Sequence, residues 1–122
     1  MTNIVIIGQD QGYISTLKVL LERRDFAVAV HHDAKNALAA ITTNAPQLII
    51  IENELTSIKA TDLANTVLQA FPDRVKIIVL TSKLSKSQAQ TWKELGITAY
   101  AKVNLDFLEF LKGIRQLVES VP

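Results

Sequence analysis

Polar side chains that could do chemistry follow short apolar runs of the sequence, at the point where each run ends. The groups are Gly8, Gln9 and Asp10; Glu52, Asn53 and Glu54; Thr81 and Ser82; and Val103 and Asn104. Carboxylate oxygens are the ligands that a hard cation prefers. The carboxylates of Asp10, Glu52 and Glu54 are therefore a candidate set that could hold a cation loosely, provided that the fold brings the runs together.

Other chemistries are excluded by residues that the sequence lacks. It has no cysteine, so disulfides, Cys-ligated metal centres and thiol catalysis are ruled out. The segment Gly8-Gln9-Asp10-Gln11-Gly12 matches neither the G-x-G-x-x-G pattern nor the P-loop pattern for binding phosphates. No serine lies at a nucleophile elbow and no histidine-based triad is evident. We expect no enzymatic activity.

Length and composition indicate one globular domain over residues 1–122. The chain is 48% hydrophobic and 20% charged, which is typical of a domain that folds alone. Its formal net charge of +1 provides no strong field to attract nucleic acid or an anionic membrane. The N-terminal apolar run is too short for a signal peptide or a membrane span, so we expect a cytoplasmic protein.

Two alternating periodicities predict an α/β fold. Three continuous β-branched runs, Ile4–Ile7, Leu48–Ile51 and Ile77–Leu80, suit the centre of a parallel sheet, and Phe26–Val30 and Ala99–Val103 suit its edges. Between them, helical spacing predicts five helices. They cover about Tyr13 to Arg24, a stretch after the N-cap Asp33, a stretch ending before Pro72, about Ser85 to Leu95, and a stretch starting near Asp106.

Five βα units with right-handed crossovers favour a three-layer α/β/α, flavodoxin-like (βα)5 fold with strand order 2-1-3-4-5. In such sheets ligands bind beyond the carboxyl ends of the strands. The topology therefore predicts that the polar groups described above meet at one edge of the sheet.

Three segments resemble the receiver domain of two-component response regulators, and the resemblance covers Asn3 to about Val118. The stretch Pro46-Gln47-Leu48-Ile49-Ile50-Ile51-Glu52 is similar to the family segment that ends in the phosphorylated Asp. Ile78-Val79-Leu80-Thr81-Ser82 resembles the segment with the switch hydroxyl, and Gly96-Ile97-Thr98-Ala99-Tyr100 resembles the one with the switch aromatic. The resemblance implies the same fold and a role in signal transduction.

The residues that carry phosphoryl chemistry in that family are altered here. Gly8 and Gln9 stand where the family has two adjacent acids that hold Mg²⁺, and Glu52 stands at the position of the acceptor Asp. Val103 stands at the position of the Lys that pairs with the phosphoryl group. Lys102 is one residue away, and strand alternation predicts that its side chain points to the other face unless the chain is rearranged locally.

These changes predict that ordinary phosphorylation and bound Mg²⁺ are absent. Phosphoryl transfer to a carboxylate depends on a metal and a lysine that neutralise charge. We expect no cofactor. Glu52 then has two interpretations: a mimic of the phosphorylated state that reaches toward Thr81 or a nearby ammonium group, or a solvated carboxylate at a strand end. The second is favoured, with Thr81 and Tyr100 in fixed positions.

Partner binding is expected on the face that receivers use, which is formed by the fourth helix, the fifth strand and the fifth helix. The candidate residues are Lys83, Lys86, Trp92, Lys93, Tyr100 and Lys102. Tryptophan is enriched at binding hot spots, although Trp92 could instead pack over the edge of the core. The lysines could favour an acidic partner or simply be solvated.

The sequence thus predicts a pseudo-receiver that signals by phosphorylation-independent protein–protein contact, binding neither nucleic acid nor membrane by itself. One alternative is a receiver with a rearranged but working site of Asp10, Glu52 and Lys102. Another is a flavodoxin-like module that binds a small ligand in a pocket lined by Gly8 and Gln9. The domain could be the N-terminal module of a longer protein, because Val118-Glu119-Ser120-Val121-Pro122 resembles the beginning of a linker.

Overall fold

The structure, a computed structural model, describes residues 2–119 of the chain. Of the expected start of a linker at Val118–Pro122, Val118 and Glu119 belong to the last helix, and residues 120–122 lie outside the described residues. The strands are β1 (Thr2–Ile7), β2 (Phe26–His31), β3 (Leu48–Glu52), β4 (Lys76–Thr81) and β5 (Thr98–Ala101). The helices are α1 (Gln11–Glu22), α2 (Ala34–Thr43), α3 (Ala60–Ala70), α4 (Lys86–Glu94) and α5 (Phe107–Glu119).

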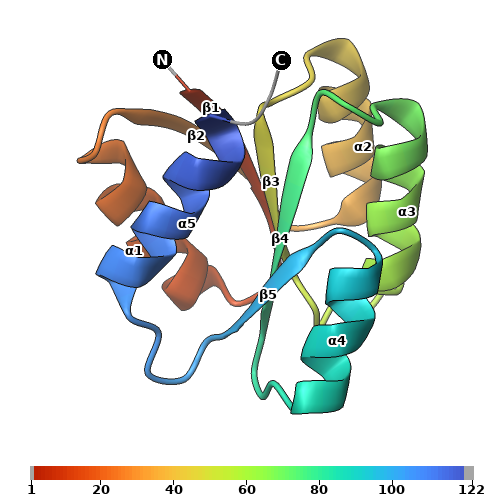
Figure 1. The fold of residues 1–122 in the computed structure, drawn as a ribbon. Coiled ribbons are helices and arrows are strands. Elements are labelled where there is room, and N and C mark those ends of the chain that lie inside the picture. The colour runs from red at the N-terminus through yellow and green to blue at the C-terminus, as the bar shows by residue number, and fades with distance from the viewer. Residues whose placement is uncertain (1, 120–122) are drawn as a thin grey trace.

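All five strands form one parallel sheet in the order β2-β1-β3-β4-β5, which confirms the predicted fold and topology. Figure 1 shows α1 and α5 on one side of the sheet and α2, α3 and α4 on the other. The three central strands are buried on both faces, as their unbroken apolar runs predict.

The sheet separates two hydrophobic clusters whose members alternate along each strand. In β3, Ile49 and Ile51 pack on the side of α2, α3 and α4, whereas Leu48 and Ile50 pack on the side of α1 and α5. All four are fully buried. Burial of each such side chain stabilises the fold by about 1.5–3 kcal/mol relative to leaving it exposed, so β3 is firmly anchored where it enters the site.

Side chains at the helix starts fix the loops on the carboxyl side of the sheet. Asp10 caps α1 by accepting a hydrogen bond from the Tyr13 backbone N–H, and Asp33 caps α2 through Asn36. Ser85 and Gln88 form a capping box at the start of α4. The Asp106 carboxylate accepts hydrogen bonds from two backbone N–H groups in the first turn of α5. The expected caps Asp33 and Ser85 are confirmed.

Two of the differences from the predicted element boundaries affect the candidate site. Helix α1 begins at Gln11, before Tyr13, because the Asp10 cap starts the helix earlier than its apolar face does. Strand β5 ends at Ala101, so Lys102 and Val103 belong to the connection to α5, in which Asn104 has a φ of 57°. Among residues 2–119, none of the helices is long and apolar enough to cross a membrane.

Candidate functional site

The loops at the carboxyl edge of the sheet bring together the polar residues that the sequence singled out. They follow β1, β3, β4 and β5, which are neighbours in the sheet. Glu52 is the last residue of β3 and Thr81 the last of β4, and both are buried. The predicted edge site is therefore formed, but its side chains pair differently from the expectation.

Glu52 is the centre of the site, and its carboxylate is fully engaged. The residue is 3% exposed. Oε1 accepts hydrogen bonds from the backbone N–H groups of Gln9 at 2.6 Å and Asp10 at 2.9 Å. Oε2 pairs with the Lys102 ammonium group. The favoured interpretation of Glu52 as a solvated carboxylate is wrong, and the carboxylate reaches an ammonium group rather than Thr81.

Lys102 lies in the site, contrary to the expectation that it would point to the other face. The residue follows the last residue of β5, and its backbone N–H donates to the Thr81 carbonyl at 2.8 Å. Its side chain reaches over the end of the sheet rather than across one face, so strand alternation no longer limits it. Val103, which the sequence resemblance assigned to the lysine position, is 66% exposed and takes no part in the site.

The ammonium group of Lys102 also pairs with Asp10 Oδ2 at 3.3 Å and lies 4.8 Å from the centre of the Tyr13 ring. Burial opposes its charge, but the hydrogen bonds and charges of Glu52 and Asp10 outweigh burial and raise the pKa of Lys102 above its ordinary value of 10.5. For Asp10, the hydrogen bond from the Tyr13 N–H and then that from Lys102 lower the pKa below 3.8. Lys102 is thus a cation at neutral pH.

Gly8 leaves the space that the Glu52 side chain fills. A Cβ atom at Gly8 would lie 2.2 Å from Glu52 Oε1 and 2.5 Å from Glu52 Cγ, far inside contact distance. The pocket beside Gly8 and Gln9 that a ligand-binding flavodoxin-like module would need is filled by this side chain.

A second carboxylate, that of Glu54, binds the loop after β4. Its Oε1 accepts hydrogen bonds from the Ser82 backbone N–H at 2.8 Å and from the Ser82 hydroxyl at 2.6 Å. Its Oε2 accepts a hydrogen bond from the Thr81 hydroxyl at 3.2 Å. The Thr81 hydroxyl also contacts the Lys83 carbonyl at 3.1 Å. The sequence placed Glu54 near the site but did not predict that it, rather than Glu52, would contact Thr81.

Tyr100 is half-buried and packs inward against α5. Its ring meets Phe110 edge-to-face, with centroids 5.1 Å apart. A Cβ at Gly113 would lie 2.3 Å from the Tyr100 hydroxyl, so this helix interior has a glycine where the ring needs room. Gly113 was missed by the sequence reasoning, although a glycine inside an otherwise regular amphipathic helix is a usable signal.

On the expected partner face, Trp92 takes the second of its two predicted roles, because it packs into the core instead of being exposed for a partner. It is 5% exposed and belongs to the cluster beneath α2, α3 and α4, because its position on α4 faces the sheet. Lys83, Lys86 and Lys93 are exposed, and none of them forms an ion pair within residues 2–119.

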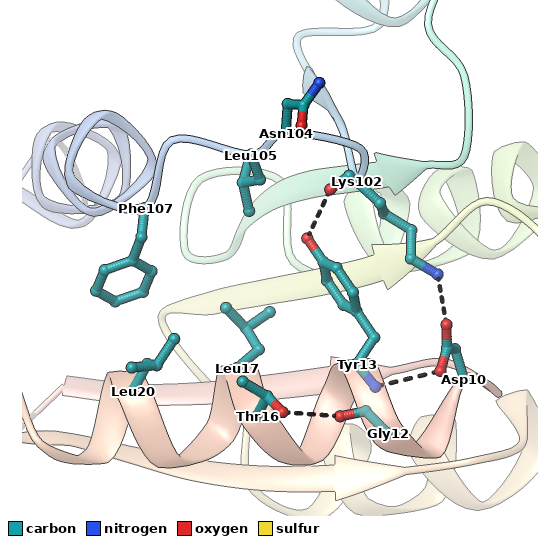
Figure 2. Close-up of a pocket in the computed structure, with 10 residues that line it drawn as sticks. All are labelled: Asp10, Gly12, Tyr13, Thr16, Leu17, Leu20, Lys102, Asn104, Leu105 and Phe107. Atoms are coloured by element: carbon teal, nitrogen blue, oxygen red, sulfur yellow. Dashed lines mark hydrogen bonds and ion pairs between the residues drawn. The ribbon is translucent and has the colours of Figure 1, made fainter.

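A groove of about 640 Å³ lies beside the ion pair of Asp10 and Lys102, between α1 and the segment that leads into α5. Figure 2 shows the side chains of Leu17 and Leu20 on one wall, with Leu105 and Phe107 opposite, and Lys102 and Asp10 at one end. Tyr13 stands between the apolar part and that end, with its hydroxyl 3.5 Å from the Lys102 carbonyl.

The residues present do not fit the Mg²⁺ ion that the receiver resemblance implies. Mg²⁺ requires near-octahedral oxygen coordination, but Gly8 supplies no ligand. Asp10 Oδ1 and Glu52 Oε1 accept from backbone N–H groups, and the Lys102 ammonium group lies on the other two oxygens, Asp10 Oδ2 and Glu52 Oε2. Glu54, the third carboxylate of the candidate set, faces the loop after β4 instead. Within the described part of the chain, no group of three His, Cys, Asp or Glu residues is arranged to hold a metal.

Comparison with known proteins places the chain among signalling domains. A family model described as "Response regulator receiver domain" matches residues 4–116. The response regulator ArlR of Staphylococcus saprophyticus is 24% identical over 122 residues, which cover 100% of this chain and 54% of that protein. The ArlR of Staphylococcus haemolyticus is also 24% identical. The chain spans about half the length of the curated relatives it matches.

Solved structures share the fold. A two-component response regulator from Clostridium difficile has a TM-score of 0.86 at 18% identity, with 98% of this chain and 97% of that one covered. The non-phosphorylated HemR receiver domain from Leptospira biflexa has a TM-score of 0.84 at 22% identity, with 97% and 94% covered.

Proposed function

Because this chain belongs to the response regulator receiver domain family, we propose that it signals by protein–protein contact without being phosphorylated. The observation that carries the proposal is the state of Glu52 at the acceptor position. Its two carboxylate oxygens accept hydrogen bonds from two backbone N–H groups and from the Lys102 ammonium group, and the residue is 3% exposed. A phosphodonor needs an accessible carboxylate oxygen for in-line attack, and Glu52 offers none.

The switch residues support a domain that stays in one conformation. The Thr81 hydroxyl is bound by Glu54, a side chain of the domain itself, and Tyr100 is packed against Phe110 and fitted over Gly113. Both residues therefore have intramolecular partners that do not depend on a phosphoryl group. A receiver built in this way presents one permanent surface to its partner.

Receiver domains interact with signalling proteins, and we propose that this one does so through α4, β5 and α5. Three large hydrophobic side chains that are exposed in the structure belong to this part of the chain, namely Leu95, Val103 and Leu108. Lys83 precedes α4, Lys86 and Lys93 lie on it, and these three exposed lysines favour an acidic partner. We further propose a cytoplasmic location, which is typical of the family.

A working but rearranged phosphoacceptor site is the competing function. One observation favours it, because Asp10, Glu52 and Lys102 do come together. The same contacts argue against it, since the ammonium group lies where a metal and a phosphodonor would have to enter. The blocked oxygens of Glu52 make the phosphorylation-independent function the better supported one.

The test is treatment of the chain with Mg²⁺ and acetyl phosphate, followed by intact mass, together with an amide-resolved NMR titration with Mg²⁺ and beryllofluoride. We expect no phosphoryl adduct and no saturating shifts at Asp10, Glu52 or Thr81. An adduct, or shifts that saturate and spread to α4 and β5, would refute the proposal in favour of the rearranged acceptor site.

A further inference from the structure

The cation of this site is supplied by the chain itself. Asp10 and Glu52 bring two negative charges to the carboxyl edge of the sheet, and the Lys102 ammonium group lies on both carboxylates. The side chain of Lys102 is 13% exposed, so the charge is held in the site rather than in solvent. In a receiver this edge is the place where the metal is expected, and here an amine occupies it.

Contacts at both ends of the Lys102 side chain fix the ammonium group in this position. The backbone N–H of Lys102 is bound to the Thr81 carbonyl, which ties the start of the side chain to β4. The Tyr13 ring covers the ammonium group from the α1 side, and Figure 2 shows the lysine extending past Tyr13 to Asp10. A divalent ion would have to eject a cation that is paired, covered and anchored.

We propose that Lys102 replaces the divalent metal of the site, acting as a permanently bound internal cation that keeps Mg²⁺ and similar ions out. Gly8 makes the replacement possible, because the missing side chain lets the Glu52 carboxylate fold back toward α1, where Lys102 meets it. The ammonium group neutralises one of the two carboxylate charges and leaves the cluster with a net charge of −1.

This inference deepens the proposed function and rests on it, but its test measures metal binding alone. A phosphoryl adduct, or shifts with beryllofluoride that spread to α4 and β5, would overturn the proposed function whatever the Mn²⁺ result. Mn²⁺ binding by the unmodified chain without either of these would overturn only the inference. The two failures are therefore distinguishable.

The experiment is a Mn²⁺ titration of the 122-residue chain, followed by paramagnetic broadening of amide signals in NMR spectra. The test variant is Lys102→Met, which removes the charge and keeps an apolar side chain against Tyr13. The matched control is Lys86→Met, because Lys86 is exposed on α4, forms no ion pair among the described residues, and its loss changes the net charge equally. Excess Mg²⁺ then tests whether the binding is reversed by a second divalent ion.

In the Lys102→Met variant we expect saturable broadening centred on the amides of Gln9 and Asp10, with an affinity at least about tenfold above that of the unmodified chain, because a positive charge beside the carboxylates is removed. Over the same Mn²⁺ concentrations, broadening at these amides in the unmodified chain and in Lys86→Met should not reach saturation, which sets the upper bound on their affinity. Equal affinity in the unmodified chain, or no gain in the folded variant, would overturn the inference. If Lys102→Met does not fold, Lys102→Gln, which retains a hydrogen-bond donor, is read by the same criteria.

Discussion

Gly8 and Glu52 fit each other so closely that the smallest side chain at residue 8 would occupy the position of the Glu52 carboxylate. An added Cβ would lie 2.2 Å from Oε1 and 2.5 Å from Cγ, and 2.6 Å from Cδ1 of Ile14 on the other side. The glycine at the end of β1 and the glutamate at the end of β3 therefore form one structural unit. The absence of a side chain at Gly8 and the length of the Glu52 side chain are therefore complementary.

The first prediction is that Gly8→Ala destabilises the domain by about 1–3 kcal/mol, as expected when a side chain is forced into a filled core. Gly12→Ala is the matched control, because the nearest atom to a Cβ at residue 12 is 3.9 Å away and the residue lies in α1. The control should be stabilised by up to about 1 kcal/mol, the helix propensity difference. Urea unfolding measures both, and an unchanged midpoint for Gly8→Ala would contradict the close fit.

Much of the fold follows from the sequence because local patterns and topology agree. The β-branched runs that become β1, β3 and β4 have no polar alternation, and a strand with both faces covered is the only arrangement that buries them all. The caps Asp33 and Ser85 lie one residue before α2 and α4 begin, where capping chemistry requires them. The parallel topology then places Asp10, Glu52 and Thr81 at one edge of the sheet.

The pairing within the site could not be predicted, because it depends on loops rather than on periodic elements. Lys102 reaches Glu52 only because β5 ends at Ala101, and the chain turns through the positive φ of Asn104 soon afterwards. Glu54 contacts Ser82 because of the course of the loop after β3, for which the sequence has no periodic signal. Periodicity fixes which face a strand residue occupies, but it does not determine the reach of side chains beyond a strand end.

The second prediction concerns the fit of Tyr100 over Gly113. Gly113→Ala should destabilise the domain when Tyr100 is present, because the added Cβ would lie 2.3 Å from the Tyr100 hydroxyl. With Tyr100→Phe the nearest ring atom is 3.5 Å away, so the same alanine should be tolerated and should stabilise α5 by up to about 1 kcal/mol. A double-mutant cycle by chemical unfolding should give a coupling of about 1–3 kcal/mol. Additive effects would contradict the contact.

The third prediction is a pH effect at Asp10. Its carboxyl pKa lies below 3.8 because of the Tyr13 N–H first and Lys102 second. A lowered pKa means that the group contributes stability above pH 3.8, which is lost as the pH falls through the folded-state pKa. Carboxyl carbon NMR should show Asp10 titrating below 3.8 in the unmodified chain. In Lys102→Met its pKa should rise, because the hydrogen bond and the charge of Lys102 are lost, while the hydrogen bond from the Tyr13 N–H still lowers it. An unchanged pKa in the variant would contradict the ion pair.

The fourth prediction separates the role of Glu54 from that of Glu52. Glu54 accepts the backbone N–H of Ser82 at 2.8 Å and the hydroxyls of Ser82 and Thr81, so its carboxylate holds the end of β4 and the loop that follows. In Glu54→Ala the Ser82 amide loses its acceptor and should exchange with solvent hydrogen about tenfold faster or more, the ratio expected when a hydrogen bond to a charged group is lost. Glu54→Gln, which keeps one acceptor oxygen, should show a smaller increase.

Glu94→Ala is the control for that experiment, because Glu94 lies on α4 and, among residues 2–119, its carboxylate accepts a hydrogen bond only from the Gln90 side chain, at 3.4 Å. It should leave the Ser82 amide unchanged. Amides of Gln9 and Asp10 should also keep their exchange rates in Glu54→Ala, since their acceptor is Glu52. If they accelerated together with Ser82, the two carboxylates would act as one cooperative unit, and the loop after β4 would be held through Glu52 and Lys102 as well. If exchange of the Ser82 amide did not accelerate, Glu54 would not be the residue that fixes the loop after β4.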